Sequence, residues 1–319
     1  MRKYAYISIP AVIMMIAGCS RIGADDFRPV IMMSANVVGH AVVTKAASVA
    51  DAYTGTVPSS DTPLAADLWF SMASGQYETE DATNQETYIP CHTKVTFVTG
   101  DPVAVLYEGE QDKALKYPTD GTVYCMGFYP QGAWSYDGSD GVLAEAQITG
   151  SRDLMFAPQI DGEWNAKFES QQFGHVLSWL KIVACATSHD AVGAWGKITG
   201  ITVSSKTEVQ LKSVDGSSVE YLTDGTVTAF EVGAGKDLDI VFDDEDGVHG
   251  SVFVSPAANV TVTVTTADGK IAEKVISVDG GFVAGKQYVL ALYFDPLAII
   301  DGFCTLTSWE NENDNLYTE

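Results

Sequence analysis

Histidine, cysteine and acidic side chains are the groups in this chain that could do chemistry, and their spacing decides which reactions are open. Nucleophilic catalysis needs a base beside a serine or cysteine, but the sequence has neither a G-x-S-x-G elbow nor an H-E-x-x-H motif. The five histidines are scattered, and no glycine-rich phosphate loop with a lysine follows an expected strand. His175 lies in an apolar run, where a hydrogen-bonded structural histidine is a better interpretation than a ligand or base. The sequence therefore predicts neither an enzyme nor a bound cofactor.

One dense cluster of carboxylates, at residues 243–247, has to be weighed as a metal site. It reads Asp-Asp-Glu-Asp-Gly, but a calcium-binding loop of the twelve-residue type ends on a glutamate, and this chain has Val254 there. No C-x-x-C pair and no histidine–cysteine spacing typical of zinc occurs either. A solvated hairpin turn is the better interpretation of the cluster, so no metal site is predicted.

Cys19 is the residue whose setting points to a covalent modification. Two basic residues give the chain a positive start, and residues 4–17 are apolar with one exception, which suits the core of a secretory signal peptide. The ending Ala17-Gly18-Cys19 resembles a bacterial lipobox, where small residues fit the signal peptidase and the cysteine sulfur takes a diacylglyceryl group. No later segment reaches about 18 uninterrupted apolar residues. We therefore expect residues 1–18 to be removed and Cys19 to carry the lipid that anchors the chain.

The other cysteines leave the disulfide state open. Cys91, Cys125, Cys185 and Cys304 are an even number in a chain that is expected to be exported, where disulfides can form. The first three lie in apolar runs, where a buried free thiol fits the sequence equally well. Whether Cys185 and Cys304 pair is therefore not predicted.

The composition favours a strand-rich globular protein with a strongly acidic surface. The chain has 319 residues, 46% of them apolar, which is enough for two domains of ordinary size. Valine, threonine, tyrosine and phenylalanine are abundant, and these residues favour strands. The 18 basic and 42 acidic residues give a net charge of −24, which repels nucleic acid and anionic lipid. No nucleic-acid partner is expected, and solubility at a crowded surface explains the charge better than recognition of a cationic partner.

Short apolar or alternating segments, spaced by roughly 8–12 residues, predict an all-β protein built of sandwiches. The clearest segment is 260–265, where Val260, Val262 and Val264 alternate with threonines. The other expected strands are 29–44 (one strand, or two broken at Gly39), 64–70, 94–99, 102–107, 123–129, 173–185 (a central strand, with a short buried helix as the alternative), 197–203, 208–211, 226–230, 238–242, 270–278, 288–294 and 303–309, and residues 152–158 form a further short apolar segment. No sustained helical period occurs. Two sandwiches fit this count, residues 46–158 and 159–319, with residues 159–165 as the linker and residues 19–45 as a lipidated tether and first strand.

Aromatic residues in expected loops offer a second kind of site. Trp134, Tyr136, Trp164 and Trp195 lie beside glycines or acids. Exposed rings can stack on sugars, whereas loop tryptophans more often plug the end of a sandwich. Trp134, Tyr136 and Trp195 are candidate ligand contacts, and a monomeric surface lipoprotein that binds host or dietary glycans is the alternative function.

Several short motifs occur together in an order that resembles a known family. They are Cys19 in the lipobox, Val42-Val43-Thr44-Lys45-Ala46 after the first strand, Gly127-Phe128-Tyr129-Pro130 with Trp134 nearby, Asp153-Leu154-Met155-Phe156-Ala157, Phe173-x-His175-x-Leu177-Ser178, and Ala284-Gly285-Lys286-x-Tyr288. With these motifs, which cover most of the chain, the sequence resembles the fimbrillin family of Bacteroidetes surface lipoproteins (the Mfa-like and major-fimbrium subunits).

The resemblance implies two transthyretin-like β-sandwich domains in tandem and a structural or accessory role in a surface fimbria. In this family a lipidated precursor reaches the outer membrane, and a trypsin-like protease cuts after an arginine and removes the first strand. The vacated groove then accepts a strand from the next subunit. Here residues 29–44 would be the removable strand, residues 303–309 with the tail a candidate donor, and Lys45 and Ala46 the processing site.

Lys45 departs from the family pattern, because it stands where the family has arginine. Arg21 precedes the strand, and Arg28 is followed by a proline, which usually blocks cleavage. Cleavage after Lys45 would suit a stalk subunit, a retained strand would suit an anchor, and a tip or accessory role is also open. The expected partners are other fimbrial subunits, the outer membrane through the lipid, and a host or bacterial surface receptor.

Overall fold

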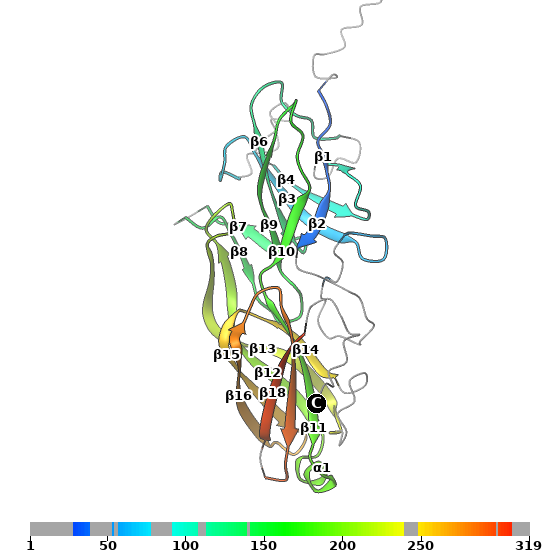
Figure 1. Ribbon diagram of the computed structural model, residues 1–319, viewed down its shortest axis with the longest axis vertical. Coiled ribbons are helices and arrows are strands. Elements are labelled where there is room, and N and C mark those ends of the chain that lie inside the picture. Colours follow the sequence, from blue (N-terminus) through cyan, green and yellow to red (C-terminus); the bar gives the residue numbers. More distant parts are fainter. Residues whose placement is uncertain are drawn as a thin grey trace, which may run out of the picture.

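The computed structural model describes residues 28–38, 53, 57–77, 91–107, 113–138, 141–238, 248–297 and 299–307. The regular structure in these ranges is strand except for one short helix, which confirms the predicted all-β class. The strands form an elongated molecule with an upper and a lower half (Figure 1). Both halves are sandwich-like arrangements of sheets.

The upper half is built around a six-stranded sheet. Its order is β2 (Ala35–Val38), β10 (Gln171–His175), β9 (Met155–Gly162), β6 (Val123–Tyr129), β3 (Leu64–Ser71) and β4 (Cys91–Phe97). Neighbouring strands are antiparallel, except that β2 runs parallel to β10 at one edge. A separate two-stranded sheet pairs β1 (Met32–Met33) with β5 (Val103–Ala104). The short segment that holds β1 and β2 therefore contributes to two different sheets.

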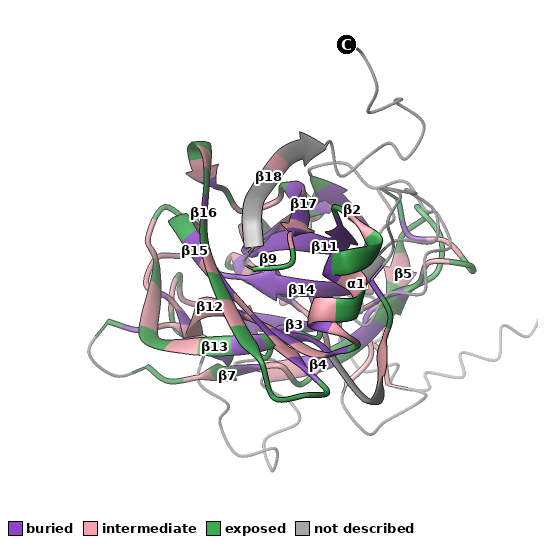
Figure 2. Ribbon diagram, turned by 90° about the horizontal axis from the view of Figure 1, so that it is seen from below, coloured by how far each residue is buried: buried purple, intermediate pink, exposed green. Residues whose placement is uncertain are grey.

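The lower half consists of a four-stranded and a six-stranded sheet. The first has the order β14 (Val248–Val254), β11 (Ser178–Ala186), β17 (Gln287–Phe294) and β18 (Ile299–Thr307). The second has the order β16 (Ile271–Phe282), β15 (Ala257–Thr266), β12 (Ile198–Leu211), β8 (Ala144–Gln147) and β7 (Trp134–Tyr136), and β13 (Val219–Lys236) also pairs with β12. Figure 2 shows β11, β14 and β17 as buried strands and β16 as a partly exposed one.

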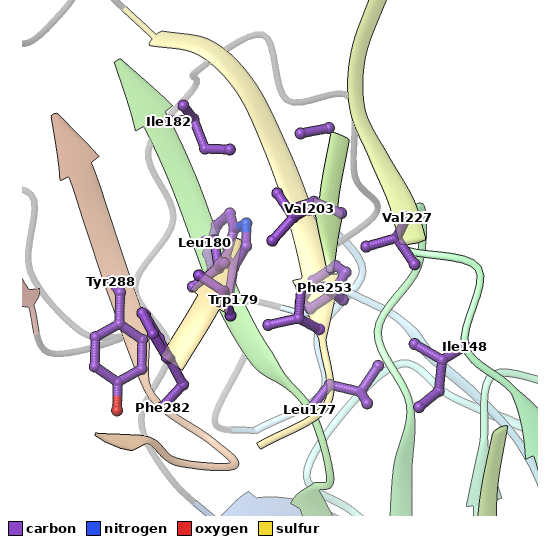
Figure 3. Close-up of a cluster of buried hydrophobic side chains, with 14 of the residues drawn as sticks. Ile148, Leu177, Trp179, Leu180, Ile182, Val203, Val227, Phe253, Phe282 and Tyr288 are labelled. Atoms are coloured by element: carbon purple, nitrogen blue, oxygen red, sulfur yellow. The ribbon is translucent and has the colours of Figure 1, made fainter. Parts of the chain in front are cut away.

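The lower sheets enclose a core that follows from strand alternation. In β15, Val260, Val262 and Val264 are fully buried, which confirms the one-faced strand expected from the valine–threonine pattern. All nine residues of β11 are buried, as expected for a strand that lies between β14 and β17. Figure 3 shows part of this core, including Leu177, Trp179, Leu180, Ile182, Val203, Phe253, Phe282 and Tyr288.

The two halves share buried surface through the upper sheet. In β3, Phe70 belongs to the upper core and its neighbour Trp69 to the lower core, because successive side chains of a strand face opposite sides. β7 and β8 join a lower sheet, whereas β9 and β10, later in the chain, return to the upper sheet. The chain therefore passes between the halves more than once.

Three expectations about the strands are wrong. The expected linker at 159–165 begins inside β9, whose residues pair with β6, so the boundary between residues 158 and 159 also falls within a strand. The expected single strand at 173–185 is divided into β10 and β11, which lie in different sheets. The expected strands at 197–203 and 208–211 are one strand, β12. The division into two tandem domains stays a prediction.

The helix α1 (His189–Trp195) was not expected from the sequence. Ser188 caps its start, because the Ser188 side chain accepts a hydrogen bond from the backbone N–H of Ala191 at 3.2 Å. Gly196, with a φ of 69°, ends it. Seven residues are too few to display a helical period, which explains the miss. Within the described ranges, no helix is long and apolar enough to cross a membrane.

Candidate functional site

His175 lies in a buried pair with a carboxylate. Its Nδ1 is 2.6 Å from Oδ2 of Asp153, and both side chains are fully buried. β10 places His175 opposite Met155 of β9, and this register brings Asp153, two residues ahead of β9, within reach. Because neither side chain contacts solvent, the pair has no access to a substrate. This geometry agrees with a structural histidine.

The described residues form no candidate metal site, and they do not include the residues predicted to be lipidated or cleaved. No three histidine, cysteine or acidic side chains are grouped there in a way that could hold a metal ion. The carboxylate cluster at 243–247 lies outside the described ranges, as do Gly39, Cys19, Lys45 and Ala46. Lipidation of Cys19 and cleavage after Lys45 stay predictions.

No disulfide joins the four cysteines of the described ranges. Cys185 lies on β11 and Cys304 on β18, and β17 runs between these two strands. Cys185 is opposite Tyr293 of β17, whereas Cys304 is opposite Leu290, so the two cysteines are also offset along the strands. Burial raises the pKa of the Cys304 thiol to about 11 and that of Cys91 to about 12. Thiols with such pKa values are protonated at neutral pH and react slowly.

Trp134 and Trp195, two of the candidate ligand contacts, are buried. Trp134 is 6% exposed and donates a hydrogen bond from Nε1 to the carbonyl oxygen of Tyr129 at 3.1 Å. Trp195 is 7% exposed at the end of α1 and donates to the carbonyl oxygen of Asp295. Stacking on a sugar needs an exposed ring face, which neither indole offers. Both instead pack against buried rings, Trp134 against Phe128 and Trp195 against Phe294, at centroid distances of 5.3 and 5.1 Å.

Tyr136 and Trp164 differ from these two. Tyr136 is half-buried, with its ring edge-on to that of Trp69 at a centroid distance of 6.0 Å. Trp164 is 37% exposed in the turn after β9. The structure does not bring Trp134, Tyr136 and Trp195 together into one site: the first two lie on β7 and Trp195 at the far end of the lower half.

The N-terminal segment, residues 28–38, is the element whose geometry could serve assembly. Its side chains alternate: Ile31, Met33 and Ala35 are fully buried and Val37 is 5% exposed. The intervening Met32 is 43% exposed. The four buried side chains belong to the upper core, beside residues such as Phe173, Leu64 and Leu115. The segment therefore fills a groove of the upper half as a strand with one apolar face.

Backbone hydrogen bonds hold this segment from several elements. Ile31 donates to the carbonyl oxygen of Leu115 at 2.8 Å and accepts from the N–H of Val105 at 3.0 Å. Further along, the N–H of Gln171 donates to the carbonyl oxygen of Ser34 at 2.9 Å, where the parallel pairing with β10 begins. β2 is an edge strand, so the other strands of its sheet pair with one another without it.

The expected donor strand, residues 303–309, lies largely within β18. β18 pairs antiparallel with β17 at the edge of the four-stranded sheet. The pairing begins with Gln287 opposite Thr307 and ends with Phe294 opposite Ile299. As a donor to another subunit, this strand would have to leave that ladder, or the residues after it would have to act instead. Residues 308–319 lie outside the described ranges.

Comparisons with known proteins agree with the fold. Two solved structures from Bacteroides share it. A proposed cell adhesion protein from Bacteroides uniformis is 15% identical, with a TM-score of 0.54 over 90% of this chain and 100% of that one. Another, from Bacteroides ovatus, is 17% identical, with a TM-score of 0.51 over 90% of this chain and 99% of that one. A comparison with curated proteins gives no match. At these identities the likeness shows the fold alone.

The sequence itself matches a family profile that is described as fimbrillin-like. The match runs over residues 71–309, which is well over half of the chain and includes strands of both halves. The chain therefore belongs to the fimbrillin-like family.

Proposed function

We propose that this protein is a structural or accessory subunit of a surface fimbria. Its family membership supports a fimbrial or surface-adhesion role at the cell surface. In the proposal, the precursor is anchored in the outer membrane by lipid on Cys19, and a protease removes the N-terminal segment by cutting between Lys45 and Ala46. A strand of the next subunit then fills the vacated groove, so its partners are other fimbrial subunits. No enzymatic step by this chain is part of the proposal.

The observation that carries the proposal is the placement of residues 28–38. The segment places four buried side chains, from Ile31 to Val37, in the upper core, and its part in the six-stranded sheet, β2, is an edge strand that can leave without interrupting the rest of that sheet. Its departure would expose an apolar groove and unpaired backbone groups such as the N–H of Val105 and the carbonyl oxygen of Leu115. Both are relieved by an incoming strand, which is the physical basis of strand addition.

The alternative, a monomeric lipoprotein that binds glycans through Trp134 and Trp195, gains no support from their burial. The proposal is tested by mass spectrometry of the mature protein in a fimbrial fraction of the native cell. We expect a peptide that begins at Ala46, for a stalk subunit, or an intact lipidated Cys19 within a polymer, for an anchor. A chain found only as a monomer, never with fimbriae, would refute the proposal.

A further inference from the structure

A hollow at the surface of the upper half lies between two turns. One turn, Thr119–Gly121, leads into β6, and the other, Glu163–Asn165, follows β9. The hollow has a volume of about 490 Å³, enough for a small part of a larger ligand. Among the five tryptophans of the described ranges, Trp164 is the exposed one, and it lines this hollow.

Trp164 is held by a rigid turn. Glu163 and Ala166 exchange two backbone hydrogen bonds, at 2.6 and 3.2 Å, around it. The Lys167 ammonium donates to the carbonyl oxygen of Trp164 at 2.6 Å, and it also lies 4.4 Å from the centre of the Tyr117 ring. Because the turn is fixed before any ligand arrives, little conformational entropy is lost when the indole is covered.

Glu163 links the second turn to the first. The hydroxyl of Thr122, the residue after the first turn, donates to Oε1 of Glu163 at 2.7 Å, so a hydrogen bond joins the two sides of the hollow. The rest of the lining is Thr119, Asp120, Gly121 and Asn165, and the Thr119 hydroxyl donates to Oδ1 of Asp120 at 3.4 Å. These groups offer a hydroxyl, a carboxylate and an amide at the rim of one aromatic ring.

We propose that this hollow binds a neutral carbohydrate, with a sugar ring stacked on Trp164. A sugar ring has an apolar C–H face for the indole, and its edge carries hydroxyl groups that donate to carboxylate oxygens and accept from an amide or hydroxyl. This inference does not depend on the fimbrial role, because it needs no second subunit. The first turn follows Tyr117, whose N–H donates to the carbonyl oxygen of Pro29 at 3.0 Å, so the test keeps the N-terminal segment in place.

The charges of the lining decide which carbohydrates fit. Among the described residues, those that line the hollow include Asp120 and Glu163 but no lysine or arginine, and the nearby Lys167 ammonium is engaged by the Trp164 carbonyl oxygen, in a chain of net charge −24. Sulfated sugars and uronates would be repelled. A cationic amine would be attracted, but a single ring is not the aromatic cage that such ligands favour, and Glu163 already accepts from Thr122. Neutral hydroxyl-rich rings remain the best match.

The test uses the chain that begins at Ser20, without the lipid, and short neutral gluco-, manno- and galacto-oligosaccharides, with uronate and sulfated oligosaccharides and a lysine-rich peptide as comparison ligands. Binding is followed by calorimetry and by tryptophan fluorescence. We expect at least one neutral oligosaccharide to bind, and Trp164→Ala to weaken it roughly tenfold or more, which is about 1.4 kcal/mol. Asp120→Ala should weaken binding less, and Trp164→Phe should retain part of it.

Leu297→Ala is the matched control, since Leu297 is 91% exposed and lies outside the hollow. It should leave binding unchanged, and all variants should keep the thermal midpoint of the parent chain because each site is exposed. The proposal is overturned if no neutral oligosaccharide binds at millimolar concentration, if Trp164→Ala leaves binding intact, or if only the lysine-rich peptide or the anionic sugars bind. The two proposals fail separately: a chain that binds no neutral sugar can still assemble into fimbriae, and a chain that is absent from fimbriae can still bind sugar.

Discussion

Removal of the N-terminal segment is the perturbation that the fold makes most informative. The comparison is between a chain that begins at Ser20, without the lipid, and a chain that begins at Ala46, the expected product of processing. The second chain lacks β1 and β2, together with the apolar face that they place in the upper core. Every other strand of both halves is retained, so a change in stability reports on the groove.

The size of the effect follows from the burial of four side chains. Ile31 and Met33 are 0% exposed and Val37 is 5% exposed, and full burial of such a side chain stabilises by about 1.5–3 kcal/mol. Ala35 adds about 0.8 kcal/mol. The sum is about 5–10 kcal/mol, an upper estimate because the unfolded chain already buries some apolar surface. This is close to the whole stability of a typical domain, about 5–15 kcal/mol. The shortened chain should therefore unfold partly or aggregate unless the groove is refilled.

Urea denaturation, followed by near-ultraviolet circular dichroism, measures the loss. A synthetic peptide of residues 28–44 added in excess should restore the midpoint of the shortened chain, since a ligand that binds only the folded state stabilises it. The two adjacent methionines allow a matched pair of peptide variants, one at a buried position and one at an exposed position. Met33→Asp, at a fully buried position, should abolish the rescue, whereas Met32→Asp, at a position 43% exposed, should retain it.

Equal midpoints for the two chains would refute the reasoning, because the segment would then contribute nothing to the upper core. Equal rescue by the two peptide variants would refute the assigned register, in which odd-numbered residues from Ile31 to Val37 face inward.

Three further predictions concern packing and protonation. Gly250→Ala should cost about 1–3 kcal/mol in urea denaturation, because its new Cβ would lie 2.5 Å from a carbonyl oxygen of β13, whereas Gly174→Ala, with 4.0 Å to its nearest neighbour, should change stability little. Asp153→Ala should cost about 2–4 kcal/mol, since it removes the buried hydrogen-bond partner of His175; a loss below measurement error would contradict this. Burial raises the pKa of Cys91 from 9.0 to about 12, so the folded state keeps a proton that the unfolded state loses, and stability should fall as pH rises through that window. Thermal midpoints at about pH 8 and about pH 10 should show a smaller fall for Cys91→Ser than for the parent chain.

Local pattern was sufficient for most strands and for the strand class of the fold. The expected strand at 123–129 coincides with β6, and 64–70 differs from β3 by one residue. In such segments the side chains themselves carry the signal, because one or both faces are buried and the flanking residues form turns. The same logic predicted the valine–threonine strand that became β15.

The pairing of distant segments could not be read from local pattern. Nothing in residues 134–147 indicates that β7 and β8 extend a lower sheet while β9 returns to the upper one, since both kinds of strand have the same alternation. The linker expected at 159–165 failed for the same reason: its polar residues mark the turn that follows β9, not a boundary between domains. The burial of Trp134 and Trp195 could not be read from the sequence either, because a glycine neighbour indicates a turn but not exposure, and both side chains fold back onto the sheets.

The geometry of β1 and β2 also limits what can replace them. The segment pairs antiparallel with β5 through Met32 and Met33 and parallel with β10 from Ala35 onward, so it changes sheet at Ser34. A strand that fills the same groove has to satisfy both ladders and place apolar side chains at alternate positions. Ala35 is fully buried between Met33 and Val37, so we expect a larger side chain at its position in an incoming strand to be destabilising. A one-residue shift of an incoming strand would turn its apolar face to solvent, so the groove selects both the register and the sequence of its occupant.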